Sequence, residues 1–308
     1  SGEESAKLEG ELREGLSGIG SVDGKTFRTL PLSSMEAEEK EALRERRSIN
    51  GEGAEKRGKE SLLLSEDEKV SITLEGEDHI RLQCLSGKAE LGRLWNEADR
   101  LDNYINERFD YAYHEKYGYL TAYPTNVGTG LRAGITLHLP LLSAGKQFGK
   151  LVSEMSRFGV AVRGVYGDGA ENYGSVYEVS NQKTLGMTEE EIIALVQQMA
   201  DRLAASERKV KSLTLRNHRL DLEDEIYKSY GVLKYAKKLS VKEAMTYLSQ
   251  VRVGEMEGLL QLKAPVNFYG LMMEIQPANM KILAPEEEKA DIGRARASYI
   301  RKMLPELV

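Results

Sequence analysis

The sequence predicts an α+β fold in which an antiparallel sheet flanked by helices precedes a helical C-terminal domain. Short segments that alternate between apolar and polar residues occur up to about residue 179, separated by turn residues, as is typical of antiparallel strands. From Thr188 onward, apolar residues recur with helical spacing beneath charged outer faces. The chain has 308 residues, a length that suits about two domains, and it contains no internal repeat.

Composition narrows the class of protein. The net charge of -6 argues against a general nucleic-acid binder and leaves room only for a local basic cleft. No run approaches the roughly 18 apolar residues that a membrane span needs. Cys84 is the only cysteine, which excludes an intrachain disulfide and favours a reducing compartment. We therefore expect a cytoplasmic protein that binds neither nucleic acid directly nor membranes.

The first 67 residues are rich in Glu, Lys, Gly and Ser and predict helices and loops. Ser33 and Glu36 have the spacing of a capping box, with Ser33 as the N-cap and Glu36 as the N3 residue. Residues 51–58 are expected to form a mobile loop. Helices are expected over residues 5–16 and 34–47.

A β-hairpin is the simplest interpretation of the segment that follows. Residues 70–74 alternate like a half-buried strand, and residues 79–85 alternate again after Gly76. An amphipathic helix over residues 91–109 comes next.

Residues 119–140 are the stretch around which the chain is organised. An apolar strand turns at Pro124 into a loop with Gly128 and Gly130, and Arg132 stands ahead of a second apolar segment. Glycines can adopt positive φ and let backbone N–H groups point at one concave spot, as in an anion nest. The stretch is thus a candidate phosphate site, and a glycine-rich hairpin with a surface arginine is the alternative.

The rest of the chain continues the pattern of strands first and helices later. A GDG turn at 167–169 and a polar loop at 180–186 separate the predicted elements. Strands are expected over residues 160–165 and 175–179, and helices over 146–157, 189–211, 213–230, 241–248 and 255–262.

Three arginines stand at predicted strand ends beside turns, namely Arg81, Arg132 and Arg163. Arginine suits forked contacts with phosphate oxygens, so the three together suggest an anion cradle, although each alone is more simply a solvated surface residue. Carboxylates accompany them: Glu77 and Asp78 before Arg81, and Asp168 and Glu171 after Arg163. Two carboxylates could grip a guanidinium acceptor, whereas solvated turn residues are the alternative.

Other reactive residues carry weaker signals. His79, His114 and Cys84 lack metal-ligand spacing, which argues against a zinc site. His138 lies in an apolar segment and is expected to be a satisfied core residue, and Cys84 is expected to be buried and inert. No P-loop or dinucleotide fingerprint is present, so any use of ATP would not involve a P-loop.

Four segments carry a resemblance: EDHIRLQCL at 77–85, YLTAYPTNVGTGLRA at 119–133, VRGVYGDGAE at 162–171 and SNQKTLG at 180–186. Together they resemble the motifs of bacterial protein arginine kinases, which belong to the phosphagen-kinase-like ATP:guanidino phosphotransferases. The resemblance extends from about Ser34 to the end of the chain. It implies a glutamine-synthetase-like guanidino kinase domain, without the large helical N-terminal domain of creatine and arginine kinases.

The resemblance also implies an activity and partners. The activity is transfer of the γ-phosphoryl of ATP, with Mg²⁺, to arginine side chains of proteins. This would mark the proteins for a AAA+ unfoldase and protease in a stress response. The implied partners are protein substrates with exposed arginines, that AAA+ machine and an activator protein, and the resemblance is compatible with a homodimer.

Site residues follow from the resemblance by position, with none assigned to a metal. Glu77 matches the catalytic carboxylate that grips the guanidinium, and Asp168 stands where the family has a second carboxylate, normally Glu. Asp291, with Arg294 and Arg296, partly matches the family's C-terminal phosphoarginine pocket. The implied ATP-binding residues are Arg81, Arg132, Ala133, Gly134, Ile135, Thr136, Arg163, Gly164, Val165, Tyr166 and Gly167.

Three departures from the family pattern keep alternatives open. The opening S-S-R-x-R-x-x-R-N segment is missing, so the chain is expected to be N-terminally shortened; Tyr123 replaces a reactive cysteine, and Asp168 is one methylene shorter than Glu. These departures favour a catalytically impaired relative that acts as a phosphoarginine-binding adaptor or regulator. A small-molecule guanidino kinase is the third hypothesis. The expected domains are an N-terminal remnant at 1–67, a catalytic core at 68–212 and a helical domain at 213–308.

Overall fold

The computed structural model describes residues 2–50, 60–167, 171–286 and 289–308 of the chain. They form two compact units. The first comprises Ser1–Ala133 and Gln182–Ala194, and the second comprises Gly134–Asn181 and Leu195–Val308. The expected mobile loop at 51–58 and the candidate residue Asp168 lie outside the described residues.

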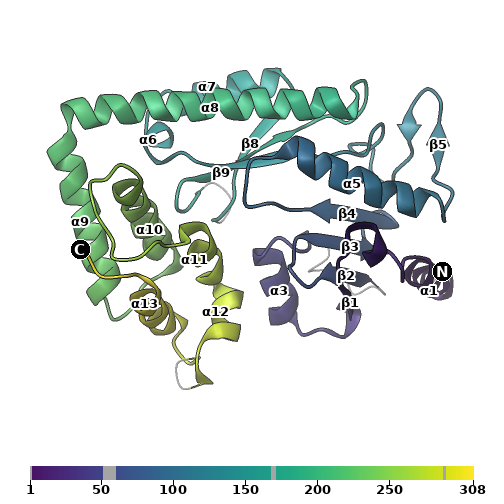
Figure 1. The fold of residues 1–308 in the computed structure, drawn as a ribbon, viewed down its shortest axis with the longest axis horizontal. Helices are drawn as coiled ribbons and strands as arrows, with labels where there is room; N and C mark the ends of the chain where they lie inside the picture. The colour runs from purple at the N-terminus through teal and green to yellow at the C-terminus, as the bar shows by residue number, and fades with distance from the viewer. Residues whose placement is uncertain (1, 51–59, 168–170, 287–288) are drawn as a thin grey trace. The chain divides into compact units, whose positions relative to one another are not determined.

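A four-stranded antiparallel sheet in the order β1-β2-β3-β4 forms the centre of the first unit (Figure 1). The pairing of Val70 with Cys84 and of Leu74 with Ile80 confirms the predicted hairpin. No strand was predicted before Val70, but the described residues there include two. The strands are β1 (Phe27–Pro31), β2 (Ser61–Ser65), β3 (Val70–Leu74) and β4 (Ile80–Cys84).

Helices cover both faces of this sheet. On one face, Leu16 and Leu101 pack with Ile72, and on the other, Leu43 packs with Leu62. Because both faces are covered, all five residues of β2 are buried, and its sequence reads as a run of leucines without alternation. Other elements among the described residues of the unit are α1 (Gly2–Gly15), α2 (Gly20–Asp23), η1 (Leu32–Ser34), α3 (Ala37–Glu45), α5 (Leu91–Asn106), β5 (Tyr113–His114) and β6 (Gly118–Tyr119).

The N-terminus of α3 corrects one prediction. The capping box was expected at Ser33 and Glu36, but it is formed by Glu36 as N-cap with Glu39 as the N3 residue. The backbone N–H of Glu36 donates to Glu39 Oε2 at 3.2 Å. Residues Leu32–Ser34 form a 3-10 turn instead, and Ser34 Oγ donates back to the carbonyl of Pro31. The helix therefore begins three residues later than the predicted capping box implies.

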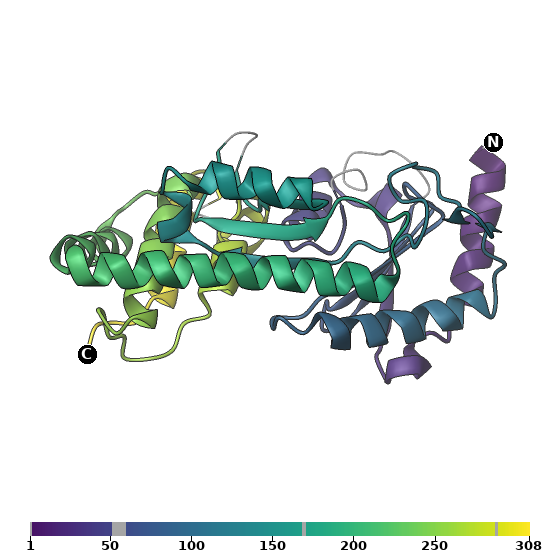
Figure 2. The ribbon, with the colours of Figure 1, turned by 90° about the horizontal axis from the view of Figure 1, so that it is seen from above.

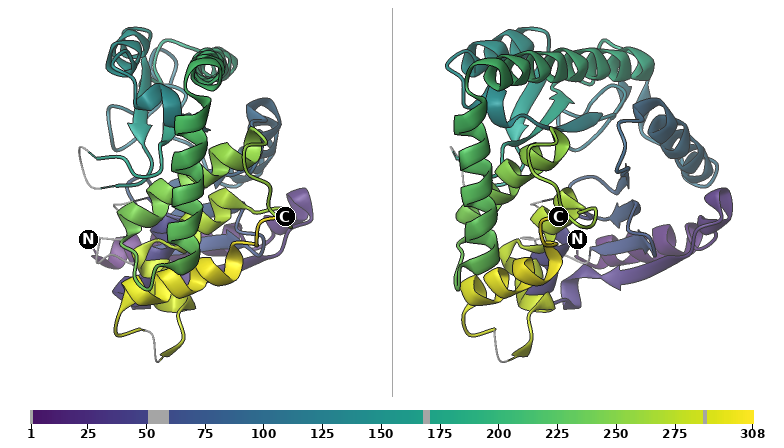
Figure 3. Two further views of the ribbon diagram at one scale, coloured as in Figure 1. Left: turned by 90° about the vertical axis from the view of Figure 1, so that its left-hand side faces the viewer. Right: turned by 60° about the vertical axis from the view of Figure 1, so that its left-hand side comes forward.

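A three-stranded antiparallel sheet in the order β7-β9-β8 forms the first part of the second unit. Its strands are β7 (Gly134–His138), β8 (Val160–Gly164) and β9 (Val176–Asn181). Figures 2 and 3 show α7 (Phe148–Arg157) beside α8 (Glu189–Asn217) on one side of this sheet. The ring of Phe148 on α7 lies 4.8 Å from that of Tyr177 on β9, centroid to centroid. A short helix, α6 (Pro140–Ser143), follows β7.

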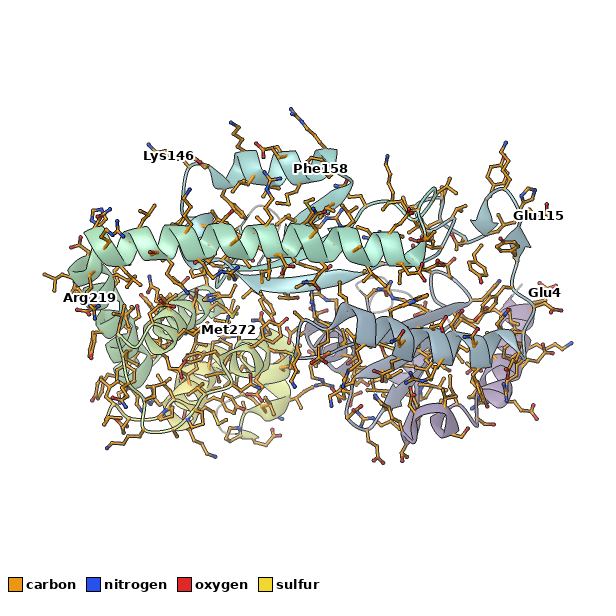
Figure 4. All side chains as sticks on the ribbon, turned by 45° about the horizontal axis from the view of Figure 1, so that its top comes forward. Glu4, Glu115, Lys146, Phe158, Arg219 and Met272 are labelled. Atoms are coloured by element: carbon orange, nitrogen blue, oxygen red, sulfur yellow. The ribbon has the colours of Figure 1, made fainter. Side chains whose placement is uncertain are left out.

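Helices make up the rest of the second unit, as predicted. Their common core includes Ile226, Leu248, Met272 and Ile300, and Figure 4 labels Met272 within this group and Arg219 at the first turn of α9. The helices are α9 (Arg219–Tyr235), α10 (Val241–Met256), α11 (Phe268–Glu274), α12 (Pro277–Leu283) and α13 (Ile292–Met303).

The predicted helix over residues 255–262 is wrong. Residues Glu255 and Met256 are the last turn of α10, and Gly258 follows with φ 65°. A glycine in the left-handed region just beyond a helix is a common termination signal. Within the described parts of the chain, no helix combines the length and the apolar character needed to cross a membrane.

Candidate functional site

The turn between β3 and β4 carries Glu77 and Asp78 and belongs to the first unit. Asp78 Oδ1 accepts a hydrogen bond from the backbone N–H of Ala122 at 2.7 Å, and Asp78 Oδ2 accepts one from Asn126 Nδ2 at 3.2 Å. These two contacts tie the turn to the first half of the glycine-rich loop between Tyr119 and Arg132, called the central loop below. Glu77, the next residue along the chain, is therefore held beside the loop that leads to Arg132.

The same turn is braced from its other side by Glu75. Its carboxylate contacts His79 Nδ1 at 2.6 Å and accepts a hydrogen bond from Ser5 Oγ of α1 at 2.9 Å. The backbone N–H of Glu75 donates to the carbonyl of His79 at 2.9 Å and closes the turn. The segment that carries Glu77 thus has fixed ends.

Thr184 anchors the second half of the central loop. It comes from the polar loop at 180–186, and its Oγ1 donates to the carbonyls of Thr125 at 3.0 Å and Val127 at 2.7 Å. The carbonyl of Thr184 accepts in return from the backbone N–H of Thr129 at 3.0 Å. Thr184 is 3% exposed, so these polar contacts are shielded from water. The predicted polar loop is a structural support for the glycine-rich loop.

The glycines of the central loop adopt the conformations that the sequence predicted. Gly128 has φ 115° and Gly130 has φ 66°, a region that side chains disfavour. A Cβ on Gly128 would stand 2.3 Å from the carbonyl oxygen of Thr184. The apolar strand expected before Pro124 is shorter than predicted, because β6 is limited to Gly118–Tyr119 and Tyr119 then pairs with Gly128.

Two of the three candidate arginines belong to the same unit as Glu77. Arg81 lies in β4, where it pairs with Thr73 of β3, and its side chain is exposed. Arg132 is also exposed and follows Leu131, whose backbone N–H donates to Thr129 Oγ1 at 3.2 Å. The first unit thus provides a carboxylate, two guanidinium groups and a glycine-rich loop.

The third arginine belongs to the second unit. Arg163 of β8 stands opposite Glu178 of the central strand β9, and Glu178 stands opposite Thr136 of β7. These three residues form one row across the sheet. Cross-strand neighbours share a face, so this row places a hydroxyl, a carboxylate and a guanidinium on one face. Glu178 was not among the residues predicted from the sequence, although a charged residue between Tyr177 and Val179 in a strand was an available signal.

Most of the remaining candidate ATP residues have a buried side chain or are glycines. Ala133, Ile135 and Tyr166 have buried side chains. Gly167 has φ 131°, and a Cβ on Gly164 would come within 2.7 Å of Asn172. Because neither glycine has a side chain, other atoms can approach the backbone closely at both positions. Gly134 and Val165 complete the set and lie in or directly after a strand.

Two residues expected to be inert have environments that agree with that expectation. His138 Nε2 contacts Ser249 Oγ at 2.7 Å. Burial, followed by the charges of Arg252 and Lys211, lowers the pKa of His138 to about 3. Burial also raises the pKa of the Cys84 thiol to about 12, so the thiolate that reacts is scarce at neutral pH.

The C-terminal candidates have different structural roles. Asp291 is the N-cap of α13, and its carboxylate pairs with Lys238 Nζ at 2.9 Å. Arg294 is exposed. Arg296 is buried, and it donates to the backbone carbonyls of Ile275 at 2.8 Å and Leu239 at 3.0 Å. Arg296 thus supports the packing of α13 against its neighbours.

A protein-built metal cage is not seen in the part of the chain that the structure describes, because no three His, Cys, Asp or Glu residues there gather around one point. In ATP-dependent enzymes Mg²⁺ is usually held by the phosphates and one or two carboxylates. Mg²⁺ bound to ATP would be compatible with such a site, because the phosphates supply ligands for it.

Comparison with known proteins extends these observations. Residues 12–210 match the family described as ATP:guanido phosphotransferase, C-terminal catalytic domain, and residues 219–307 match the protein-arginine kinase McsB C-terminal domain. The chain belongs to the protein-arginine kinase family. Within that family, it is 36% identical over 304 residues to the protein-arginine kinase of Caldanaerobacter subterraneus subsp. tengcongensis, covering 98% of this chain and 90% of the relative.

Further relatives agree with this assignment. The protein-arginine kinase of Moorella thermoacetica is 41% identical over 277 residues, covering 89% of this chain and 79% of that protein. Lombricine kinase has a similar fold, with a TM-score of 0.59 at 22% identity, over 69% of this chain and 61% of that chain. The substrate-free duplicated taurocyamine kinase from Schistosoma mansoni gives a TM-score of 0.57 at 18% identity, over 80% of this chain and 36% of that chain. The predicted guanidino kinase fold and the predicted family are confirmed.

Proposed function

We propose that this chain transfers the γ-phosphoryl group of ATP to arginine side chains of proteins. The observation that carries the proposal is the pair of hydrogen bonds that the Asp78 carboxylate accepts from Ala122 and Asn126. They hold the Glu77 turn against the loop that leads to Arg132. This connection supports a site in which the proposed guanidinium-binding carboxylate Glu77 and the proposed phosphate-binding residue Arg132 act together. Family membership supplies the reaction class.

In this proposal Glu77 binds and orients the acceptor. A carboxylate can accept two parallel N–H bonds from a guanidinium, which fixes its plane and leaves one nitrogen aimed at the phosphorus. That nitrogen forms the new N–P bond while the bond from the γ-phosphorus to the bridging oxygen of ADP breaks. The nitrogen loses one proton in the step, and Glu77 is the proposed acceptor of that proton.

The arginines neutralise the phosphates. Phosphoryl transfer depends on positioning and on stabilising charge across the transferring group and the leaving ADP. Arg81, Arg132 and Arg163 are the proposed side-chain donors. The backbone of residues 132–136 and 163–167 is proposed to line the nucleotide, because its glycines permit close approach.

Two further assignments rest on the sequence motifs. Asp168 is proposed as the second carboxylate around the guanidinium. Asp291, with Arg294 and Arg296, is proposed to contribute to a phosphoarginine pocket; the burial of Arg296 makes Arg294 the better candidate to reach a ligand.

The wider role follows the family. We propose that the chain works in the cytoplasm with an activator protein, and that it can form a homodimer. Its phosphorylation of proteins would mark them for a AAA+ unfoldase and protease during stress.

An assay with two acceptors tests the proposed function against its rivals. The chain is incubated with MgATP and either casein or free L-arginine, and phosphoarginine is measured by mass spectrometry without acid steps. The proposal expects phosphoarginine on casein at a higher rate than on free arginine. A faster reaction with free arginine would favour a small-molecule guanidino kinase. No product with either acceptor, together with binding of a phosphoarginine peptide, would favour the adaptor hypothesis.

A further inference from the structure

A pocket in the first unit lies outside the residues assigned above. It has a volume of about 420 Å³ and is lined by Asn106, Asp110, Tyr111, Tyr113 and Tyr119. These residues come from the end of α5, the segment after it, and the β5–β6 hairpin, whose tip carries Glu115 (Figure 4). The pocket is a shallow hollow open to solvent, which suits a side chain presented by another polypeptide.

Three tyrosine rings form much of the pocket wall. The ring centroid of Tyr119 lies 5.7 Å from that of Tyr111 at an interplanar angle of 81°, and 5.3 Å from that of Tyr113 at 69°. Steeply inclined rings can present more than one face to a single guest. Aromatic faces attract cations, and sets of such rings are used to recognise organic cations.

The walls are held in place by contacts within the protein. Tyr111 donates its hydroxyl hydrogen bond to Asp102 Oδ1 of α5 at 2.9 Å. Tyr113 and Tyr119 stand directly opposite each other in the antiparallel pair β5–β6. Tyr113 is 60% exposed, so Tyr111 and the backbone of the hairpin are the restrained parts of the wall, and their restraint lowers the entropic cost of binding.

The charges around the pocket favour a cation. Asp110 contributes a carboxylate and Asn106 an amide oxygen, both in exposed residues at its edge. Asp102, Glu189 and Asp99 all act electrostatically on Tyr119 and, after burial, raise its pKa. The hairpin's own cation, Lys116, lies over the ring of Tyr117, which does not line the pocket, at 5.3 Å.

Arginine is the cation that matches all of these groups. Its planar guanidinium stacks on aromatic rings and donates several N–H bonds to carboxylate and amide oxygens at once. The chain itself makes such a stack at the end of α5, where the guanidinium carbon of Arg108 lies 3.4 Å from the ring centroid of Tyr104. A lysine ammonium offers no planar face and fewer donors.

We propose that the tyrosine pocket binds an arginine side chain of a polypeptide substrate, as a docking contact separate from the arginine that Glu77 holds. The identity of the occupant as substrate rests on the proposed function. The pocket would favour polypeptides that present a second arginine at a suitable distance from the one that reacts.

Binding of a labelled peptide without ATP tests the proposal. The peptide has one arginine in a glycine and serine background, and matched peptides carry lysine or citrulline at that position. The protein is the full chain with the substitution Glu77→Gln. Fluorescence anisotropy gives the Kd of each peptide. Citrulline keeps the shape of arginine and removes the charge. We expect the arginine peptide to bind most tightly, and Tyr113→Ala or Asp110→Asn to weaken it by about two- to fivefold each.

The hairpin offers a matched control. Tyr117→Ala removes an exposed tyrosine from the same hairpin that does not line the pocket, so it should leave Kd unchanged, and Tyr113→Phe should keep most of the affinity. Equal Kd values for the arginine and citrulline peptides, or for Tyr113→Ala and Tyr117→Ala, would overturn the proposal. Tyrosine ring NMR of the unsubstituted pocket provides a second measurement: the arginine peptide should shift the signals of Tyr113 and Tyr119, and unchanged signals would also overturn it.

Failure of this proposal is distinguishable from failure of the proposed function. Phosphoarginine formed on casein without Tyr113-dependent peptide binding would reject the pocket and leave the kinase in place. Tyr113-dependent binding without any phosphoarginine would support the pocket and reject the kinase.

Discussion

Asp78 Oδ1 accepts a hydrogen bond from the backbone N–H of Ala122 at 2.7 Å, across a sequence separation of 44 residues. This contact joins the turn next to Glu77 to the loop that leads to Arg132. A displacement of about 1 Å in such a site can reduce the rate about a hundredfold, so the bond has consequences beyond its own energy.

Replacing Asp78 should therefore affect activity more than stability. In Asp78→Asn one of the two acceptor oxygens becomes a donor, so either the Ala122 or the Asn126 contact is lost. We expect kcat/KM for casein to fall about ten- to a hundredfold and the free energy of unfolding to fall by about 1 kcal/mol. Steady-state kinetics and urea unfolding measure the two effects.

Asp67 provides the matched control for Asp78. It lies in the turn at the other end of β3 and accepts hydrogen bonds from Ser65 Oγ at 2.7 Å and the backbone N–H of Lys69 at 3.1 Å. Asp67→Asn keeps the Oδ1 acceptor and removes the charge that pairs with Lys25 and Lys69, so it should lower the free energy of unfolding by about 1 kcal/mol and leave kcat/KM near the original value. Equal losses of kcat/KM in both variants would argue against a positioning role for Asp78.

Thr184 should prove necessary for nucleotide binding through the loop that it supports. Thr184→Val keeps the shape of the side chain and removes the hydroxyl that donates to Thr125 and Val127. Loss of a buried donor costs about 1–3 kcal/mol, and we expect weaker ADP binding by isothermal titration calorimetry. Thr246→Val, which removes an exposed helical hydroxyl that bonds only within α10, should bind ADP normally; equal affinity in both variants would contradict the role of Thr184.

Gly128 should not tolerate a side chain. Gly128→Ala combines φ 115° with a Cβ 2.3 Å from the carbonyl oxygen of Thr184. We expect a loss of at least about 2 kcal/mol in the free energy of unfolding and impaired ADP binding. Gly149→Ala is the control, because a Cβ there in α7 meets nothing within 4 Å, and it should stabilise the chain by about 0.5–1 kcal/mol. Equal changes in the free energy of unfolding for the two variants, measured by thermal unfolding, would show that Gly128 is not restricted in this way.

The buried His138 should make stability depend on pH. Its pKa is lowered to about 3 in the folded chain from about 6.5 when unfolded. The unfolded state therefore binds a proton more readily, so stability is fully present above about pH 6.5 and is lost as pH falls. Between pH 7 and pH 5 the loss due to His138 should be about 2 kcal/mol.

The comparison for this effect is His138→Gln, which can still contact Ser249 and does not titrate in this range. Its free energy of unfolding should fall less between pH 7 and pH 5 than that of the original chain. Parallel curves for the two proteins would show that His138 is not buried in its neutral form.

The sequence predicted elements with clear periodicity and missed contacts that span long separations. Residues 70–74 and 91–109 have patterns that match their structure closely. The strand β2 was missed because a short leucine run that is buried on both faces has no alternation. The capping box was misplaced because Ser33, Glu36 and Glu39 are spaced three residues apart, so two capping boxes fit the sequence and only the 3-10 turn at Leu32–Ser34 decides between them.

The candidate site shows the same division. Motifs predicted Glu77, Arg81, Arg132 and the glycine-rich loop as parts of the site. They could not show that Asp78 and Thr184 fix this loop, because those bonds connect residues 44 to 59 positions apart. The sequence also could not show which residues are neighbours across the sheet, because only the strand register places Glu178 between Thr136 and Arg163.

The role of Glu77 is the central claim, and its conservative substitution tests it most directly. The chain and its Glu77→Gln variant are each incubated with MgATP and casein, phosphoarginine is quantified by mass spectrometry, and ADP affinity is measured in parallel. We expect phosphoarginine from the original chain, loss of nearly all product in Glu77→Gln, and similar ADP affinity in both. Equal amounts of phosphoarginine from the two proteins would contradict it.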